Sequence, residues 1–178
     1  MRAVRTHLEL SRDAAGDTPT DTAPAGDALD VVRVERPTAV EYRALYAAVG
    51  GAWHWRDRDA WSDERLQRHL DDPRVSLWLL REGDARLGYF ELVRRAGDAG
   101  DGRDDAEVEL LYFGLVPGAH GRGLGRRLLE RAMAEAWALG AARLVLNTCT
   151  LDHPAALPNY LARGFRVVRE EAYEVTTD

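Results

Sequence analysis

The fold of this 178-residue chain is decided by the stretch Leu115-Val116-Pro117-Gly118-Ala119-His120-Gly121-Arg122-Gly123-Leu124-Gly125-Arg126-Arg127-Leu128-Leu129. An apolar strand ends at the proline, a glycine-rich loop follows, and a long amphipathic helix begins. The glycines at 121, 123 and 125 permit a tight turn and leave backbone N–H groups uncovered. Those groups, together with the positive end of the helix, make an anion site that suits a pyrophosphate.

Three cations, Arg122, Arg126 and Arg127, gather at the start of that helix, where positive charge opposes the helix dipole. We expect an anion to lie between them. The loop lacks the Gly-Lys-Ser/Thr ending that places a lysine and a magnesium ligand, so a nucleotide-triphosphate enzyme is disfavoured.

With 46% hydrophobic and 30% charged residues, the composition is that of one globular domain with its own core. The net charge of −6 argues against a general nucleic-acid binder and weakly favours a cationic partner such as an amine. No stretch approaches the ~20 apolar residues of a membrane span, and the N-terminus has no apolar region typical of a secretory signal. The single cysteine, Cys149, excludes an internal disulfide and a cysteine-rich zinc site. We therefore expect a cytoplasmic protein that holds no metal.

Apolar periodicity and capping signals predict a mixed α/β fold. Thr38 and Glu41 have the spacing of a capping box, and Ser62 is a good N-cap, so helices are expected to start at both places. Helices are predicted over residues 38–49, 62–71, 124–139 and 154–163, and strands over residues 2–10, 29–35, 75–81, 86–93, 106–116, 143–148 and 165–173.

The domain organisation predicted from this order is an N-terminal strand and flexible linker over residues 1–28, followed by one domain over residues 29–178. A second loop rich in Gly and Asp, residues 94–105, is expected to be disordered at its tip. The strand–loop–helix–strand unit around the opening stretch must be a right-handed crossover. The N-terminal strand could pair across a homodimer.

Two separated motifs carry a family resemblance. His120-Gly121-Arg122-Gly123-Leu124-Gly125 resembles the central motif Gln/Arg-x-x-Gly-x-Gly/Ala of the GNAT superfamily of N-acetyltransferases, with His120 in the first position. Tyr160-Leu161-Ala162-Arg163-Gly164-Phe165 matches the family's Tyr-x-x-x-Gly-Phe, while His153 stands where the family has Asn. Pro158 falls inside the predicted helix, where we expect a kink. The resemblance covers residues from about Val31 onward and implies the GNAT fold, a central mixed, mostly antiparallel sheet flanked by helices.

The resemblance implies acetyl-CoA as co-substrate and direct acetyl transfer to a primary amine of a small molecule or peptide. The pyrophosphate would take the backbone N–H groups of the glycine loop, and the pantetheine arm would lie along the end of the preceding strand. The coenzyme-binding residues so implied are Phe113, Leu115, His120, Gly121, Arg122, Gly123, Leu124, Gly125, Arg126 and His153.

Two catalytic residues follow from the same resemblance. Tyr160 matches the family tyrosine that protonates the coenzyme thiolate, and a phenol near pKa ~10 beside a thiol near ~8.5 permits that transfer. The alternative is that Tyr160 is packed in the core with its hydroxyl hydrogen-bonded there.

The reaction also needs a base, because an alkylammonium group with a pKa near ~10 is mostly protonated at neutral pH. Glu109, which shares a strand face with Glu107, coincides with the glutamate that histone-type members use. The alternatives are that water is the base and that Glu109 is a structural or substrate-orienting carboxylate.

Trp53, His54 and Trp55 lie in the segment that shapes the acceptor pocket in this superfamily, and aromatic faces can hold a cationic amine. The alternative is two core tryptophans beside an exposed histidine. A non-catalytic module that binds or senses acyl-CoA through the same loop also fits the sequence.

Overall fold

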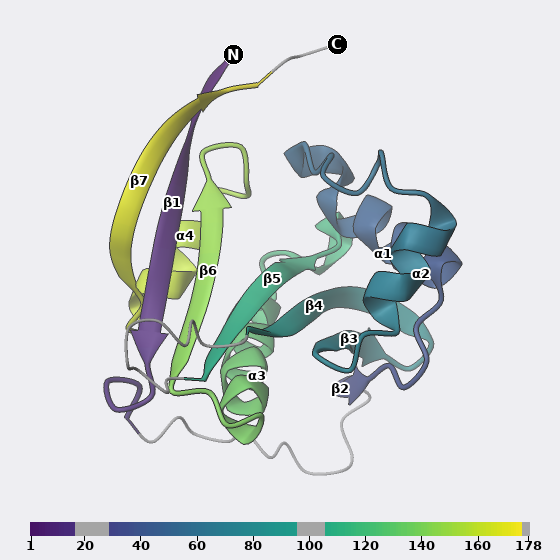
Figure 1. The fold of residues 1–178 in the computed structure, drawn as a ribbon, viewed down its shortest axis with the longest axis horizontal. Coiled ribbons are helices and arrows are strands. Elements are labelled where there is room, and N and C mark those ends of the chain that lie inside the picture. Colours follow the sequence, from purple (N-terminus) through teal and green to yellow (C-terminus); the bar gives the residue numbers. More distant parts are fainter. Residues whose placement is uncertain (17–28, 96–105, 176–178) are drawn as a thin grey trace.

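One mixed sheet runs through the molecule, with strand order β2-β3-β4-β5-β6-β1-β7 (Figure 1). The computed structural model describes residues 1–16, 29–95 and 106–175. Most of the predicted linker and the predicted tip of the 94–105 loop lie outside these residues. Pairing is antiparallel except between β5 and β6. The described strands are β1 (Arg2–Ser11), β2 (Leu29–Arg33), β3 (Val75–Glu82), β4 (Ala85–Arg95), β5 (Glu107–Leu115), β6 (Arg143–Cys149) and β7 (Arg166–Glu174).

The N-terminal strand belongs to this sheet. β1 pairs with β6 along one edge and with β7 along the other, so both of its edges are used within the chain. The suggestion that this strand pairs across a homodimer is therefore wrong, because no edge of β1 is left for a partner. It also packs Leu8 and Leu10 into the main core, which makes it part of the same folding unit as residue 29 onward.

Helices cover both faces of the sheet. They are α1 (Ala39–Gly50), α2 (Asp63–Leu70), α3 (Leu124–Ala138) and α4 (Ala156–Ala162), with short 3₁₀ turns η1 (Gly51–Trp53) and η2 (Pro117–Ala119). The predicted capping box is confirmed. Thr38 Oγ1 accepts from the Glu41 amide at 3.2 Å, and Glu41 Oε2 accepts from the Thr38 amide at 3.2 Å. Ser62 caps α2 through its side chain alone, with Oγ accepting from the Arg65 amide at 3.2 Å. None of the described helices is long and apolar enough to cross a membrane.

Pro158 does not kink α4. It is the third residue of that helix, in the first turn, where a backbone N–H has no intrahelical acceptor in any case. The proline therefore costs the helix no hydrogen bond.

The two faces of the sheet carry two apolar clusters. The larger one packs α3 and α4 against the sheet, and it includes Phe90, Leu128, Leu144 and Tyr160. The smaller one packs α1 and α2 on the opposite face, through Tyr42, Leu66 and Tyr89 among others. The segment after α1 is thereby held above one side of the sheet, while the glycine loop and α4 belong to the other.

A bulge in β5 sets which side chains face which cluster. Glu91 pairs with Tyr112 and Leu92 with Leu110, so Leu111 is an extra residue in β5. Before the bulge, Leu110 packs on the α3/α4 side. After it, Tyr112 packs with Leu111 on the α1/α2 side, and Phe113 returns to the α3/α4 side.

The β5–β6 ladder is short. It runs from the Glu107–Arg143 pair to the Leu110–Leu146 pair, and beyond Leu110 the two strands diverge (Figure 1). The backbone groups of residues 111–115 on that side therefore have no ladder partner on β6.

A buried polar network joins the α1/α2 layer to the sheet. Glu91 on β4 is completely buried, and its carboxylate accepts from the Tyr42 hydroxyl at 2.6 Å and from His69 Nε2 at 2.5 Å. Arg58, whose side chain is 8% exposed, places Nη2 3.8 Å from the same carboxylate. Buried charges of this kind are retained only when they are paired.

Glu91→Ala should lower the free energy of unfolding by about 3–5 kcal/mol, because it leaves the Arg58 charge buried without its partner. The matched control is Glu82→Ala, which removes a half-exposed partner of Arg122 and should cost less than about 1 kcal/mol. Denaturant unfolding of both variants measures this difference, and equal costs would contradict it.

Candidate active site

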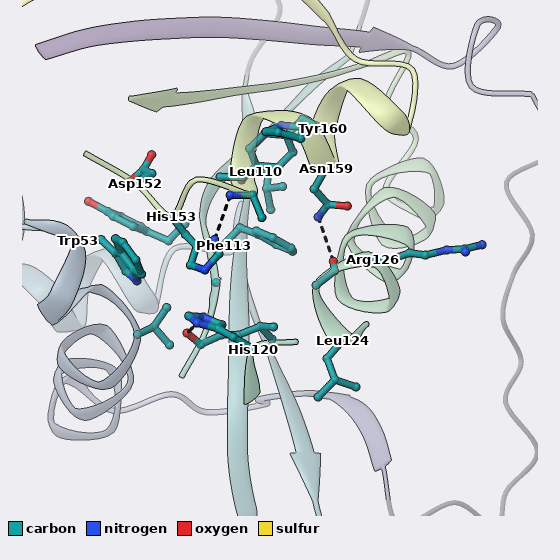
Figure 2. Close-up of a pocket in the computed structure, with 18 of the residues that line it drawn as sticks. Trp53, Leu110, Phe113, His120, Leu124, Arg126, Asp152, His153, Asn159 and Tyr160 are labelled. Atoms are coloured by element: carbon teal, nitrogen blue, oxygen red, sulfur yellow. Dashed lines mark hydrogen bonds between the residues drawn. The ribbon is translucent and has the colours of Figure 1, made fainter. Parts of the chain in front are cut away.

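A cleft of about 570 Å³ opens where β5 and β6 diverge. One end is formed by the glycine loop and the first residues of α3, and the other by the segment after α1 and the turn between β6 and α4. Figure 2 shows Phe113 near the centre, with Tyr160 and Asn159 on one side of it and His120, His153 and Trp53 on the other. The structure thus brings together residues that are more than 100 positions apart in the chain.

The glycine loop forms one end of the cleft as predicted from the sequence. Gly121 has φ +75°, and Gly123, the N-cap of α3, has φ +73°, a left-handed conformation that other residues rarely adopt. A Cβ at either position would meet nothing within 4 Å, so the backbone there is open. The loop and the start of α3 line the cleft, and the N-terminus of a helix is a site where an anion can bind.

The three arginines do not converge on that space. Arg122 pairs with Glu82 on β3 at 2.7 Å and does not line the cleft. Arg126 lines the cleft, yet it pairs with Glu130 at 3.0 Å and points away from His120 and His153 (Figure 2). Arg127 does not line the cleft either. The three side chains thus do not gather at one point in this structure, because Arg122 precedes the helix and the consecutive residues Arg126 and Arg127 project about 100° apart around its axis.

Tyr160 lies in the wall of the cleft and is 5% exposed. Its ring packs against Phe113 and Phe165, each at a centroid distance of 5.9 Å. Burial raises the pKa of Tyr160 well above its usual value, and the negative charge of Asp152 adds to this effect. The phenol is therefore protonated at neutral pH. Its neighbour Asn159 donates to the Gly125 carbonyl at 3.3 Å and ties α4 to the start of α3 (Figure 2).

The rings of His120 and His153 meet edge to face in the cleft, with centroids 4.5 Å apart, and Trp53 contacts His153 in the same manner at 5.0 Å. His120 Nε2 lies 3.2 Å from the Leu115 carbonyl, which can only accept, so this nitrogen carries the proton. His153 Nδ1 accepts from the Ala155 amide at 3.0 Å, which leaves Nε2 as its donor. Partial burial and the neighbouring His120 lower the pKa of His153, so its ring is neutral near pH 7.

Glu109 is not brought to the cleft. It stands opposite Val145 in the intact part of the β5–β6 ladder, before the strands diverge. Its carboxylate accepts two hydrogen bonds from the Arg95 guanidinium, and Glu109 is not among the residues that line the cleft. Glu107 is likewise paired, with Arg143 at 2.7 Å.

The segment after α1 supplies the other end of the cleft. Trp53 and Trp55 line it, whereas His54 is exposed, with φ +57°, and does not. Among the lining residues that sequence reasoning did not assign to the site are Asp57, Tyr112 and Asp152. Asp57 and Asp152 gave no signal beyond being carboxylates near other predicted site residues, and Tyr112 reaches this side only because of the bulge at Leu111.

Comparison with known proteins agrees with this geometry. Residues 42–165 match the model of the acetyltransferase (GNAT) family, which is more than half of the chain. The chain belongs to the GNAT acetyltransferase family. An uncharacterized N-acetyltransferase of Mycobacterium tuberculosis is 33% identical over 106 residues, which cover 60% of this chain and 62% of that protein. A mycothiol acetyltransferase of Geodermatophilus obscurus is 28% identical over 166 residues, covering 91% of this chain and 52% of that protein.

Solved structures share the GNAT fold. An aminoglycoside N-acetyltransferase in complex with CoA superposes with a TM-score of 0.58 at 15% identity, covering 87% of this chain and 96% of that chain. The fold class and the family resemblance predicted from the two motifs are thus confirmed. The match spans less than two thirds of the length of the two curated relatives named above.

Gly123→Ala should lower the free energy of unfolding by about 1–2 kcal/mol, because Ala is strained at φ +73° at the start of α3. Gly118→Ala is the matched control, since a Cβ there also meets nothing within 4 Å but the backbone is not left-handed. Thermal or denaturant unfolding compares them. Equal stability of the two variants would show that the left-handed N-cap is not strained by a side chain.

Proposed function

We propose that this GNAT protein is an N-acetyltransferase that uses acetyl-CoA and transfers the acetyl group directly to a primary amine. The observation that carries the proposal is one continuous cleft that joins the Gly121–Gly125 loop to Tyr160 between diverging strands. A coenzyme with a pyrophosphate, an extended amide-containing arm and a reactive thioester matches these three parts in order.

The residues present fit that coenzyme. The open backbone at Gly121 and Gly123 offers N–H groups to a pyrophosphate. The unpaired side of residues 111–115 offers strand-like hydrogen bonds to the pantetheine amides, and Phe113 and Leu115 supply apolar walls. His153 Nε2 is a donor in place of the family's Asn, so the substitution keeps a hydrogen bond available to the arm.

Acetyl-CoA supplies an acetyl group activated as a thioester. For the leaving thiolate, Tyr160 is the proton donor that the geometry supports best, since it lines the cleft and packs against Phe113. The alternative, a module that only binds acyl-CoA, uses the same loop and makes Tyr160 structural. Thiol release on a panel of amines distinguishes the two, because a sensor binds the coenzyme and releases none. If calorimetry detects no binding of acetyl-CoA at millimolar concentration, both the acetyltransferase and the acyl-CoA-binding module are refuted.

Tyr160→Phe should lower kcat about 10²-fold or more, since it removes the proton donor but keeps the ring that packs on Phe113 and Phe165. The KM for acetyl-CoA should stay within a factor of two to three. Steady-state thiol release measures both constants, and Tyr173→Phe, a tyrosine on β7 outside the cleft, is the control. Unchanged turnover in Tyr160→Phe would refute the role of the phenol.

Glu109→Gln should change kcat by less than about threefold, because this carboxylate is paired with Arg95 away from the cleft. The same assay at several pH values tests it. A large loss of kcat that is restored at high pH, where free amine is abundant, would instead assign Glu109 as the general base.

A further inference from the structure

The two ends of the cleft differ in charge. Among the described residues that line it, the carboxylates are Asp57 and Asp152, both at the acceptor end, and the one guanidinium is that of Arg126, beside the glycine loop. No described cation lies within ion-pair distance of Asp57 or Asp152.

An aromatic pair connects the two carboxylates. Trp55 Nε1 donates to Asp152 Oδ1 at 3.3 Å, and the Trp55 ring contacts the Tyr112 ring at a centroid distance of 5.1 Å. The Tyr112 hydroxyl in turn donates to Asp57 Oδ2 at 3.3 Å. Carboxylate, indole, phenol and carboxylate therefore form one continuous surface at the acceptor end.

Both carboxylates keep acceptor capacity for a ligand. Asp152 Oδ2 is well bonded, to the Thr148 hydroxyl at 2.7 Å and the Cys149 amide at 2.9 Å, whereas Oδ1 has only the longer bond from Trp55. Asp57 accepts the single long bond from Tyr112. An ionised carboxylate can accept about four hydrogen bonds, so each has lone pairs left.

The two arginines that flank Asp57 in the chain form ion pairs with other carboxylates. Arg56 pairs with Asp59 at 3.3 Å. Arg58 pairs with buried Glu91 on β4 at 3.8 Å, and its guanidinium lies 3.8 Å from the Trp61 ring centroid and 5.1 Å from the Tyr112 ring centroid. Two carboxylates beside aromatic faces make a surface that favours a cation.

We propose that the acceptor carries a second positive charge, with Asp152 facing the amine that is acetylated and Asp57 holding the second cationic group. This assignment rests on the proposed function, because it specifies the acceptor of the same reaction. Asp152 is placed at the reacting end by its position beside α4 and by the effect of its charge on the Tyr160 hydroxyl. Asp57 is exposed at the rim, where a second ammonium group of an extended diamine or amino sugar can keep part of its hydration.

The test is calorimetric titration of the protein, with CoA present, by linear α,ω-diamines of three to six carbons and by the monoamines of the same lengths. The best diamine should bind at least about tenfold more tightly than its monoamine, the size expected of a partly exposed charge-assisted contact. Asp57→Asn should remove that advantage and leave the affinities for the monoamine and for CoA unchanged. Asp84→Asn, in the exposed β3–β4 turn, removes the same charge far from the cleft and should have no effect.

Equal binding of diamines and monoamines would overturn the inference, and so would an Asp57→Asn variant that retains the diamine preference. Because binding is measured without acetyl transfer, the two proposals fail separately. Acetylation of amines with no preference for a second charge overturns the inference alone. Selective diamine binding that Asp57→Asn abolishes, with no thiol release from acetyl-CoA, supports the dicationic site and overturns the proposed reaction.

Discussion

The β5–β6 ladder stops at the Leu110–Leu146 pair, and the candidate active site exists because the pairing stops there. A parallel pair that continued would use the backbone groups of both strands and bring their side chains into contact. Because the strands diverge instead, residues 111–115 present one unpaired edge, and α3 and α4 can approach from one face while the segment after α1 approaches from the other. The cleft is thus a property of the backbone, and side chains only shape it.

The bulge at Leu111 decides which side chains enter that space. An unbroken alternation along β5 would place Leu111 and Phe113 on one face and Tyr112 on the other. The extra residue puts Tyr112 on the α1/α2 side and Phe113 on the α3/α4 side. Phe113 therefore packs on Tyr160, and Tyr112 meets Trp55 and Asp57. The insertion of Leu111 thus directs one aromatic ring, Tyr112, to one wall of the cleft and another, Phe113, to the opposite wall.

Local signals in the sequence predicted the local structure well. The capping box at Thr38, the N-cap at Ser62 and the glycine loop before α3 each depend on residues a few positions apart, and all three are present. The family followed from two motifs, and it is confirmed. Two features could not be predicted from the sequence because they depend on pairing between strands that are far apart in the chain. The insertion of β1 between β6 and β7, and the capture of Glu109 by Arg95, are decided by strands that are distant in the chain.

The positions of the carboxylates in the fold decide which of them line the cleft. Leu110, in the last ladder pair, lines the cleft, whereas the adjacent Glu109 alternates to the other face of β5 and is bonded to Arg95. Asp57 and Asp152 come from loops that flank the diverging ends, so they do reach the cleft. Buried Glu91 on β4 takes the ion pair of Arg58, the residue that follows Asp57 in the chain. Asp57 therefore stays without an ion-pair partner among the described residues, because the sheet already uses the charge of its neighbour.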